Sequence, residues 1–295
     1  MSKTLEQRLP GVMIVAAGMD CSGKGTIVKG LEEWANEANL KVFDLRAYEK
    51  EKGDFPDIQE VLEYDVILSA EPHYALAGAA LRKRMIVNRT QTEIPQKSAL
   101  DNEIARSISI QKISIDYTAS ATAQMFALDR LVAYTEITIP LLKAGKIIFQ
   151  ERHVESSLVY QPVQALLEGK TEDEESFREQ CVMPLEGNIL ALRKYPANAI
   201  FVARCTVEEA MRRKLARIEK DDQCKFEREK FQTMLKERYE SPWFKNIFSL
   251  YGTDVEYVDT SGQDVEKSKR NATWAWIGYL HRLSKEGRLP RILDK

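Results

Sequence analysis

Apolar positions along the chain fall into two alternating patterns, short β-branched runs and longer stretches with helical spacing. The short runs predict strands over residues 12–17, 41–45, 65–69, 146–151, 199–204 and 255–259. The longer stretches predict helices over residues 26–39, 75–87, 99–144, 156–168, 172–185, 207–220, 226–239 and 264–285, with the third divided near Thr118. Residues 48–57 carry Gly53 and Pro56 and predict a loop. Alternating strands and helices are typical of βαβ units, so we expect a parallel sheet covered on both faces.

Composition narrows the class of protein. The 295 residues include 43 basic and 45 acidic side chains, a net charge of −2, which argues against nucleic acid as a partner. We see neither a membrane-spanning apolar run nor a signal-peptide core in MSKTLEQRLPG, and the four cysteines have no zinc-site or disulfide spacing. Without internal repeats or low-complexity linkers, we expect a single domain over residues 1–295, cytoplasmic and without a membrane partner.

The first apolar run leads into a glycine-rich motif. It ends at Gly18, and Gly23 and Lys24 complete the pattern G-x-x-x-x-G-K before a helical stretch. Glycines let backbone N–H groups point inward, and the helix N-terminus attracts phosphate. A plain glycine-rich turn is the alternative. The candidate phosphate-binding residues are Gly18, Asp20, Cys21, Ser22, Gly23, Lys24, Gly25 and Thr26.

Two residues of this motif are unusual. Gly25 stands where a Ser or Thr hydroxyl usually binds Mg²⁺, and Thr26 comes one residue late, so water and phosphate would hold more of the ion. Asp20 places a carboxylate in a loop that binds polyanions. It could accept a hydrogen bond from a sugar hydroxyl or hold a magnesium-bound water, and its alternative is a turn-forming Asp.

The ends of other predicted segments also carry charge. The strand from Lys146 ends in Glu151 and Arg152, where a carboxylate can lie near Mg²⁺ and an arginine can hold a phosphoryl group. Glu151 and Thr26 are therefore the candidate metal ligands. The pair Asp129–Arg130 lies in an apolar helix and is either a structural ion pair or an arginine presented into a cleft. Residues 212–228 are either a solvated face or a basic flap.

Five segments occur in an order that resembles the thymidylate kinase family of nucleoside monophosphate kinases. They are GMDCSGKGT (18–26), EPHYALAGAALR (71–82), FALDR (126–130), ERHVESSLVYQ (151–161) and FVARCTVEEAMRRKLAR (201–217) followed by KFERE (225–229). With the strand pattern, the resemblance favours a P-loop NTPase fold. This is a three-layer α/β/α sandwich around a central, mainly parallel five-stranded sheet, with a lid over residues 212–228.

The resemblance implies ATP-dependent phosphoryl transfer to a nucleoside monophosphate, above all dTMP to dTDP, with ATP and Mg²⁺ as cofactors. Asp20 would face the acceptor sugar. Because Cys21 stands where some members carry a loop arginine, the lid would supply the charge. The catalytic set would be Lys24, Asp20, Glu151, Arg152, Arg213 and Arg217. Arg82 and Arg130 would hold the acceptor phosphate, in a substrate site completed by Pro72, Phe126, Asp129, Tyr160 and Gln161.

Departures from the family pattern leave other functions open. Glu151 replaces the usual Asp and resembles deoxynucleoside kinases, in which a glutamate would deprotonate a 5′-hydroxyl. Gly25 resembles adenylate kinases, and an extra helical region over residues 87–118 would lie beside the acceptor pocket. A catalytically weak nucleotide-binding regulatory protein is the third possibility. Relatives are commonly dimers, so we expect a homodimer, with the apolar helix over residues 124–142 as one candidate interface.

Overall fold

A single parallel sheet forms the centre of the computed structural model, which describes residues 9–84, 117–216, 229–262 and 264–293. Its strands are β1 (Val12–Ala17), β2 (Val42–Asp44), β3 (Val66–Ala70), β4 (Ile147–Glu151), β5 (Ala199–Arg204) and β6 (Asp254–Asp259). They are arranged in the order β2-β3-β4-β1-β5-β6, and every neighbouring pair is parallel. The predicted α/β class is confirmed. The five-stranded sheet expected from the resemblance is wrong, because all six predicted strand segments form strands and pair in one sheet.

Strands β3, β4 and β1 are neighbours and run parallel, so their carboxyl ends are aligned. Ala16 of β1 is opposite Glu151 of β4, and Glu151 is in turn opposite Ala70 of β3. The residues that follow these three strands therefore meet at one edge of the sheet. In parallel α/β sheets this edge is where ligands bind.

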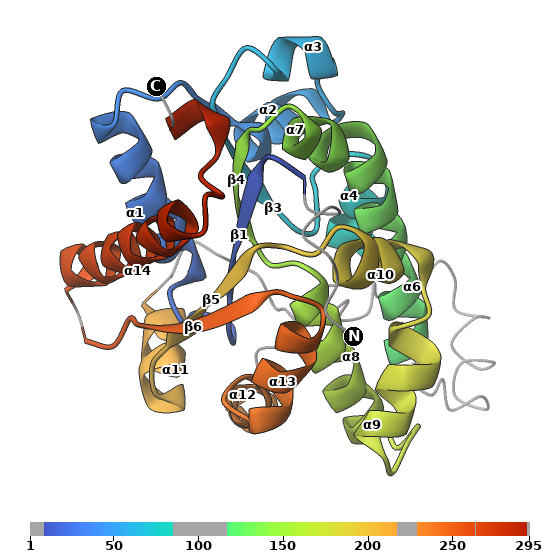
Figure 1. Ribbon diagram of the computed structural model, residues 1–295. Coiled ribbons are helices and arrows are strands. Elements are labelled where there is room, and N and C mark those ends of the chain that lie inside the picture. Colours follow the sequence, from blue (N-terminus) through green and yellow to red (C-terminus); the bar gives the residue numbers. More distant parts are fainter. Residues whose placement is uncertain (1–8, 85–116, 217–228, 263, 294–295) are drawn as a thin grey trace, which may run out of the picture.

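Alternate residues of β1 face two different helical layers, as the pleat of a strand requires. Val12, Ile14 and Ala16 belong to the core formed with helices α1 (Lys24–Glu37) and α14 (Val265–Lys285). Met13 and Val15 belong to the core on the other side. Figure 1 shows α1 and α14 side by side on one face of the sheet, with most other helices on the opposite side.

Helices α1 and α14 approach each other closely at Gly30. A Cβ added to Gly30 would lie 2.7 Å from the carbonyl oxygen of Lys269, so only glycine permits this contact. The Lys269 ammonium is 2.6 Å from the carboxylate of Glu33, and the ring of Trp34 packs edge-on against Trp276 with 5.2 Å between centroids. The C-terminal helix is thereby fixed to the helix that follows the glycine-rich loop.

The other layer is built from many shorter helices, and π-helical turns extend three of them. The α-helices are α2 (Leu45–Lys52), α3 (Ile58–Val61), α4 (Leu76–Arg84), α6 (Ala119–Ala133), α7 (Ile139–Lys143), α8 (Val154–Leu167), α9 (Glu174–Phe177), α10 (Glu186–Ile189), α11 (Val207–Leu215), α12 (Glu229–Tyr239) and α13 (Pro242–Leu250). The π-helical turns are η2 (Tyr134–Thr138), η3 (Arg178–Val182) and η4 (Leu190–Lys194), and a 3₁₀ turn, η5, spans Arg291–Leu293. Apolar side chains from α6, α7, α8, α12 and α13 form the core of this layer.

Two predicted segments differ from the structure. The expected loop over residues 48–57 begins as helix α2, because Asp44 accepts a hydrogen bond from the N–H of Ala47 and Gly53, at φ +74°, ends the helix. Its charged residues are good helix formers. The expected helix over residues 172–185 divides into α9 and η3. The predicted helix start near Thr118 is confirmed, since its hydroxyl caps α6 by accepting from the N–H of Ala121. The helix predicted before it lies outside the described residues.

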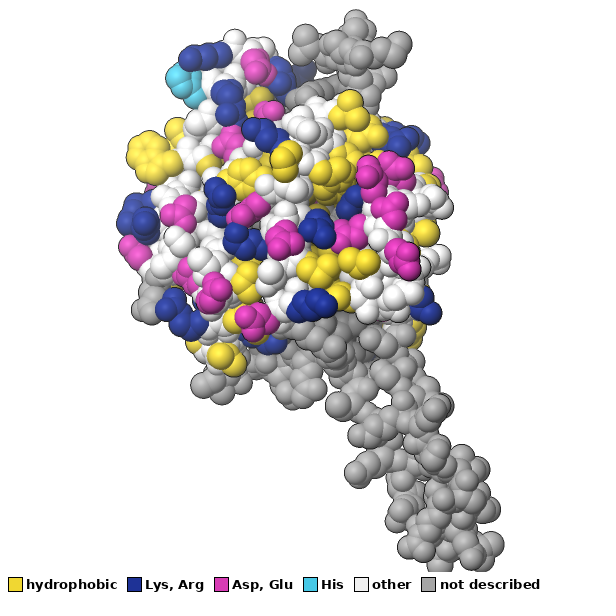
Figure 2. Space-filling view, turned by 90° about the horizontal axis from the view of Figure 1, so that it is seen from below, with side chains coloured by type: hydrophobic (Ala, Val, Ile, Leu, Met, Phe, Trp, Pro, Cys, Tyr) yellow, Lys and Arg dark blue, Asp and Glu magenta, His cyan; other side chains and the backbone are white. Residues whose placement is uncertain are grey.

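Two further predictions fall largely outside the described residues. Of the extra region 87–118 only residues 117 and 118 are described, and of the lid 212–228 only residues 212–216. Within the described ranges, no helix combines the length and apolar character needed to cross a bilayer. On the face seen in Figure 2, basic and acidic side chains are interspersed, in keeping with the small net charge.

Candidate functional site

The glycine-rich loop, residues 18–23, turns sharply between β1 and α1. Gly18 and Gly23 have φ angles of +130° and +106°, a conformation that favours glycine. A Cβ on Gly18 would lie 2.8 Å from the Ser22 hydroxyl and 3.0 Å from the carbonyl oxygen of Ala203. Both motif glycines are therefore required by the backbone. Helix α1 begins at Lys24, directly after the loop, so its positive N-terminus lies beside the loop.

Lys24 lies over the loop and is almost fully buried, at 4% exposure. Its ammonium donates hydrogen bonds to the carbonyl oxygens of Gly18 at 3.1 Å and Met19 at 2.7 Å. Burial lowers the pKa of Lys24 to about 8, and the nearby charge of Arg152 contributes to the same effect. The ammonium remains mostly protonated at neutral pH and is only partly neutralised by Asp20, 3.9 Å away.

Asp20 is held from two sides. The guanidinium of Arg152 donates to its carboxylate, and the amide of Gln232 donates to the other carboxylate oxygen at 3.1 Å. The side-chain carbonyl of Gln232 also accepts from the backbone N–H of Asp20 at 2.8 Å. Burial by itself would raise the pKa of Asp20, but the charges of Arg152 and Lys24 outweigh it and the pKa is lowered. Asp20 is therefore an ionised carboxylate that orients Arg152.

Arg152 follows β4 directly and has the unusual φ angle of +64°. Its backbone N–H donates to the carbonyl oxygen of Ala16 at 3.0 Å, which fixes this strained residue against β1. The guanidinium also lies 5.2 Å from the centre of the Tyr160 ring. Burial opposes its charge, but Asp20 raises the pKa of Arg152 well above its usual range. The guanidinium is a fixed positive charge beside Lys24.

Glu151, the last residue of β4, lies beside the start of α1. A Cβ added to Gly25 would lie 3.5 Å from the Oε2 atom of Glu151, an ordinary van der Waals contact. The side chain of Thr26 is half-buried one residue further along α1. Carboxylate and hydroxyl oxygens are suitable Mg²⁺ ligands, so the donor types fit this ion.

Protein side chains need to supply only part of the ligand shell of Mg²⁺. Within the described parts of the chain, no cluster of three or more His, Cys, Asp or Glu side chains could hold a metal ion. Mg²⁺ typically keeps only one or two protein carboxylates and completes its shell with phosphate oxygens and water. Glu151 beside the glycine-rich loop matches that arrangement, with Thr26 as the other candidate ligand.

A second arginine, Arg82 on α4, is close enough to Arg152 for the two positive charges to interact. Its Nε–H donates to the carbonyl oxygen of Pro72 at 2.7 Å, and its guanidinium stacks 3.8 Å from the ring centre of Tyr74. Burial lowers the pKa of Arg82, and repulsion from Arg152 contributes. An anion bound between Arg82 and Arg152 would relieve that repulsion, because it would neutralise both charges.

A third arginine was not singled out from the sequence. Arg46 on α2 makes a bidentate pair with Asp44, with Nε–Oδ1 and Nη2–Oδ2 distances of 2.9 and 2.8 Å. Burial opposes its charge, but Asp44, with a smaller contribution from Glu151, raises the pKa of Arg46. Arg46 therefore adds a positive charge on the Glu151 side of the site.

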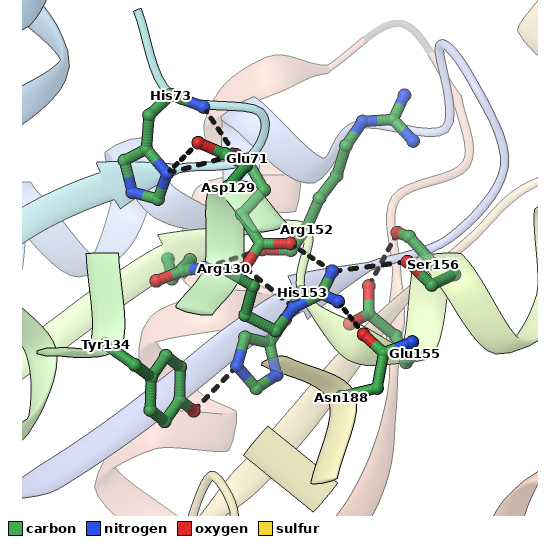
Figure 3. Close-up of polar contacts among 12 residues, drawn as sticks. Glu71, His73, Asp129, Arg130, Tyr134, Arg152, His153, Glu155, Ser156 and Asn188 are labelled. Atoms are coloured by element: carbon green, nitrogen blue, oxygen red, sulfur yellow. Dashed lines mark hydrogen bonds and ion pairs between the residues drawn. The ribbon is translucent and has the colours of Figure 1, made fainter. Parts of the chain in front are cut away.

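Arg130 on α6 is fully buried and engaged with protein groups. It forms a bidentate ion pair with Glu71, at 3.0 Å from Nε to Oε1 and 2.5 Å from Nη2 to Oε2. It also donates to Ser157 at 3.2 Å and to the side-chain oxygen of Asn188 (Figure 3). Burial raises the pKa of Glu71 although Arg130 opposes it. In this arrangement Arg130 supports the Glu71 turn, and its role in binding acceptor phosphate stays a prediction.

Asp129, next to Arg130, supports the same turn. Its carboxylate accepts from the backbone N–H of His73 at 3.0 Å and lies 3.2 Å from the imidazole Nδ1 (Figure 3). Burial opposes protonation of His73, but Asp129 outweighs it and the pKa of His73 is raised. The pair Asp129–Arg130 thus fixes the segment from Glu71 to Tyr74, which carries Pro72 and contacts Arg82.

The remaining predicted substrate residues lie on α6 and α8. Phe126 is half-buried, while Tyr160 donates from its hydroxyl to the carbonyl oxygen of Gly18 at 3.3 Å. Gln161 is buried, and its Oε1 has no hydrogen-bond partner among the described residues. His153, by contrast, is packed inside the protein against the hydroxyl of Tyr134 at 2.7 Å, and burial lowers its pKa well below the usual range. It does not face the loop cations.

Arg213 lies on a different side of the loop from Arg152. Its guanidinium donates to the carbonyl oxygens of Ser22 at 3.2 Å, Gly262 at 2.9 Å and Thr260, and to Glu209 at 2.8 Å. It fixes α11 to the back of the loop. Arg217, the other predicted lid arginine, lies outside the described residues.

The structure therefore brings most predicted catalytic residues to one edge of the sheet and adds several that the sequence did not reveal. Gln232, Arg46, Glu71 and Asn188 were missed. The Glu-Pro segment could have drawn attention to Glu71, but no local signal paired it with Arg130, 59 residues away. Gln232 gave no signal, because it lies 212 residues from Asp20 and an isolated glutamine is usually a surface residue.

A parallel α/β sandwich in which a glycine-rich loop joins the central strand to a helix has the architecture of a P-loop kinase. No protein-family model matches the chain. Curated relatives do match. The chain is 29% identical over 151 residues to a probable thymidylate kinase of Pyrococcus horikoshii, which covers 51% of this chain and 52% of that protein.

Two further relatives carry the same name. A probable thymidylate kinase of Caldivirga maquilingensis is 34% identical over 91 residues, 31% of this chain and 43% of that protein. One from Thermococcus onnurineus is 28% identical over 150 residues, 51% and 53% of the two chains. The matched part of the chain spans about half the length of these relatives, or less. The similarities point, at modest identity, to a divergent relative of nucleotide kinases.

Proposed function

We propose that this protein transfers the γ-phosphoryl group of MgATP to a nucleoside monophosphate, with dTMP as the leading acceptor. The observation that carries the proposal is the convergence of Lys24, Arg152 and Arg82 beside the glycine-rich loop, at the carboxyl ends of β1, β3 and β4. Lys24 and the loop N–H groups suit the ATP phosphates. Arg152 and Arg82 remain to hold a phosphate on the acceptor, which a free nucleoside would not carry.

Phosphoryl transfer depends mainly on positioning and on charge that meets the transferring group. Lys24 and Arg152 supply fixed charge, and Asp20 orients Arg152 through their ion pair. Mg²⁺, when bound with ATP, would neutralise phosphate charge, with Glu151 and Thr26 as the residues that would hold it. Arg213 and Arg217 are proposed to act from the lid.

The acceptor pocket is proposed to lie between α4, α6 and α8. Pro72, Phe126, Asp129, Tyr160 and Gln161 would shape it, with Arg130 behind the Glu71 turn. The name shared by the relatives favours thymine as the base. A homodimer through residues 124–142 is also proposed, and Leu128 on this segment is 46% exposed.

The test is an ADP-release assay with each nucleoside and each nucleoside monophosphate. We expect release with dTMP, or with another monophosphate if the base differs. Lys24→Met should lower kcat by about a hundredfold or more, because one positioned donor is typically worth that much. The control is Lys29→Met, an exposed lysine on the same helix.

Three results would contradict the proposal. Release with nucleosides only would favour a nucleoside kinase in which Glu151 is the base. No release with any acceptor, despite binding of ATP, would favour a nucleotide-binding regulatory protein. Full activity in Lys24→Met, with an unchanged melting temperature, would show that the glycine-rich loop is not the ATP site.

A further inference from the structure

Gln150 is a buried polar residue in the strand that leads to the candidate site. It lies on β4 after the buried apolar residues 147–149, and its exposure is only 2%. Ile148, on the same face of the strand, belongs to the core formed with α6 and α8. A glutamine is costly in such a place unless its amide is hydrogen-bonded. Its hydrogen-bond partners therefore explain why it is there.

The side-chain amide of Gln150 donates to two acceptors. Its Nε2 atom lies 3.0 Å from the backbone carbonyl oxygen of Arg152 and 3.3 Å from the Oε1 atom of Glu71. Because both partners are acceptors, an NH₂ group fits between them, and neither a carboxylate nor a flipped amide does. Glu71 is itself fixed by its ion pair with Arg130 and by the bond from its backbone N–H to the carbonyl oxygen of Glu151, at 2.9 Å. The amide thus joins the Arg152 carbonyl to a fixed neighbour.

The carbonyl that Gln150 holds belongs to a residue in an unfavourable backbone conformation. Arg152 has a φ angle of +64°, which surrounding contacts must maintain in a residue other than glycine. Its N–H is bound to Ala16 and its carbonyl to Gln150, so the peptide groups on both sides are held. This conformation directs the guanidinium to Asp20 and into electrostatic reach of Lys24.

We propose that Gln150 is a positioning residue: through the Arg152 carbonyl it maintains the left-handed turn that places the Arg152 guanidinium beside the glycine-rich loop. In Gln150→Met, which has a side chain of similar length but cannot donate, the turn should relax and the guanidinium should leave Asp20. The consequence for phosphoryl transfer rests on the proposed function, whereas the position of Arg152 can be tested without it.

The first readout is the pKa of Lys24, which needs no nucleotide. Burial and the charge of Arg152 lower this pKa to about 8. If the guanidinium moves away, its repulsion is lost and the negative charge of Asp20 is less neutralised, so the pKa of Lys24 should rise. Protein labelled with ¹³C at lysine Cε gives the titration by NMR, with the Lys24 signal assigned from its absence in Lys24→Met. We expect Gln150→Met to cause roughly half or more of the rise that Arg152→Met causes.

The second readout is kcat with the monophosphate that the unmodified protein accepts best. A misplaced guanidinium should lower kcat by about tenfold or more and leave the KM for ATP unchanged, since Lys24 and the loop stay in place. In the Arg152→Met background, Gln150→Met should lower kcat no further, because the group that it positions is gone. If Gln150 only stabilised the sheet, it would lower kcat by the same factor in both backgrounds.

The matched control is Gln164→Met. Gln164 is also a buried glutamine, at 5% exposure, and its amide donates to the carbonyl oxygen of Tyr117 at 3.1 Å. Loss of this amide should lower the melting temperature, as in Gln150→Met, but should change neither the pKa of Lys24 nor kcat. If Gln150→Met is too unstable to assay, Gln150→Asn keeps the amide but shortens the side chain by one methylene, and the same two changes are expected.

Two results would overturn the inference. One is an unchanged pKa of Lys24 in the Gln150 variants, and the other is an equal loss of kcat with and without the Arg152 side chain. If the unmodified protein turns over no monophosphate while the pKa of Lys24 still rises in Gln150→Met, the proposed function fails and the positioning of Arg152 by Gln150 stands.

Discussion

Glu155 is a buried carboxyl group whose ionisation should destabilise the folded protein. It lies near the start of α8, with no exposed surface. One carboxylate oxygen accepts from the Ser156 hydroxyl at 2.8 Å, and the other has no hydrogen-bond partner among the described residues. Burial raises the pKa of Glu155 from the ordinary 4.5 to about 7, and the nearby charge of Glu71 adds to the effect. We expect Glu155→Gln to stabilise the protein at alkaline pH.

The size of the effect follows from linkage between protonation and folding. Between pH 4.5 and about 7 the folded state binds more protons at Glu155 than the unfolded state, so stability falls as pH rises. Above about pH 7 the loss is complete. Each pKa unit is worth about 1.4 kcal/mol, so the loss that accumulates between pH 5 and pH 8 is about 2.5 kcal/mol. The Gln side chain of Glu155→Gln cannot ionise, so the variant should not lose this stability.

Urea unfolding at pH 5 and pH 8 measures this difference. The buried amide of Gln lacks one partner at both pH values, so the informative quantity is the change in relative stability between them. We expect the free energy of unfolding of the variant, relative to that of the unmodified protein, to increase by about 2.5 kcal/mol as pH rises from 5 to 8. The control is Glu63→Gln, at an exposed position, whose stability relative to the unmodified protein should not change with pH. A relative stability of Glu155→Gln that does not change with pH would refute the reasoning.

Two other contacts yield predictions. Arg130→Met should lower stability by about 3–5 kcal/mol, because it leaves Glu71 buried and unpaired, and changing Glu71 to Leu as well should recover most of the loss in urea unfolding. A loss of acceptor binding with unchanged stability would show instead that Arg130 contacts the substrate. Gln232→Glu keeps its shape but places a second carboxyl group against Asp20. The kcat for phosphoryl transfer should therefore fall at pH 8 and recover towards pH 6 as the new group is protonated. In the control Gln180→Glu, at an exposed position, the ratio of its kcat to that of the unmodified protein should not change with pH.

Local patterns predicted most of the fold. The strands were visible because β-branched apolar runs bury both faces in a parallel sheet, and the helix start at Thr118 was visible as a cap. Helix α2 was missed because its charged residues suggest a loop until the caps at Asp44 and Gly53 are considered together. The order of strands was not predicted, because the central place of β1 depends on pairing with residues 130 or more positions away.

The residues of the candidate site could likewise be predicted only in part. The glycine-rich loop and Glu151 with Arg152 could be predicted because each is a short segment with its own chemistry. The long-range partners of the buried charged residues could not be predicted. Arg130 meets Glu71 across 59 positions, and Gln232 meets Asp20 across 212. Only the packing of α12 and α6 against the strand ends brings them together.

The close contact between α1 and α14 has a consequence for synthesis on the ribosome. Helix α1, which would present its N-terminus to phosphate, is formed by residues 24–37, but the face around Gly30 is covered by residues 265–285. A nascent chain that has emerged only through β5 carries the loop and most of the site, yet leaves Trp34 without Trp276. The part of α1 that α14 covers, around Gly30 and Trp34, stays exposed to chaperones and proteases until the last helix has left the ribosome. Maturation of the phosphate site is thus tied to translation of a segment more than 200 codons downstream.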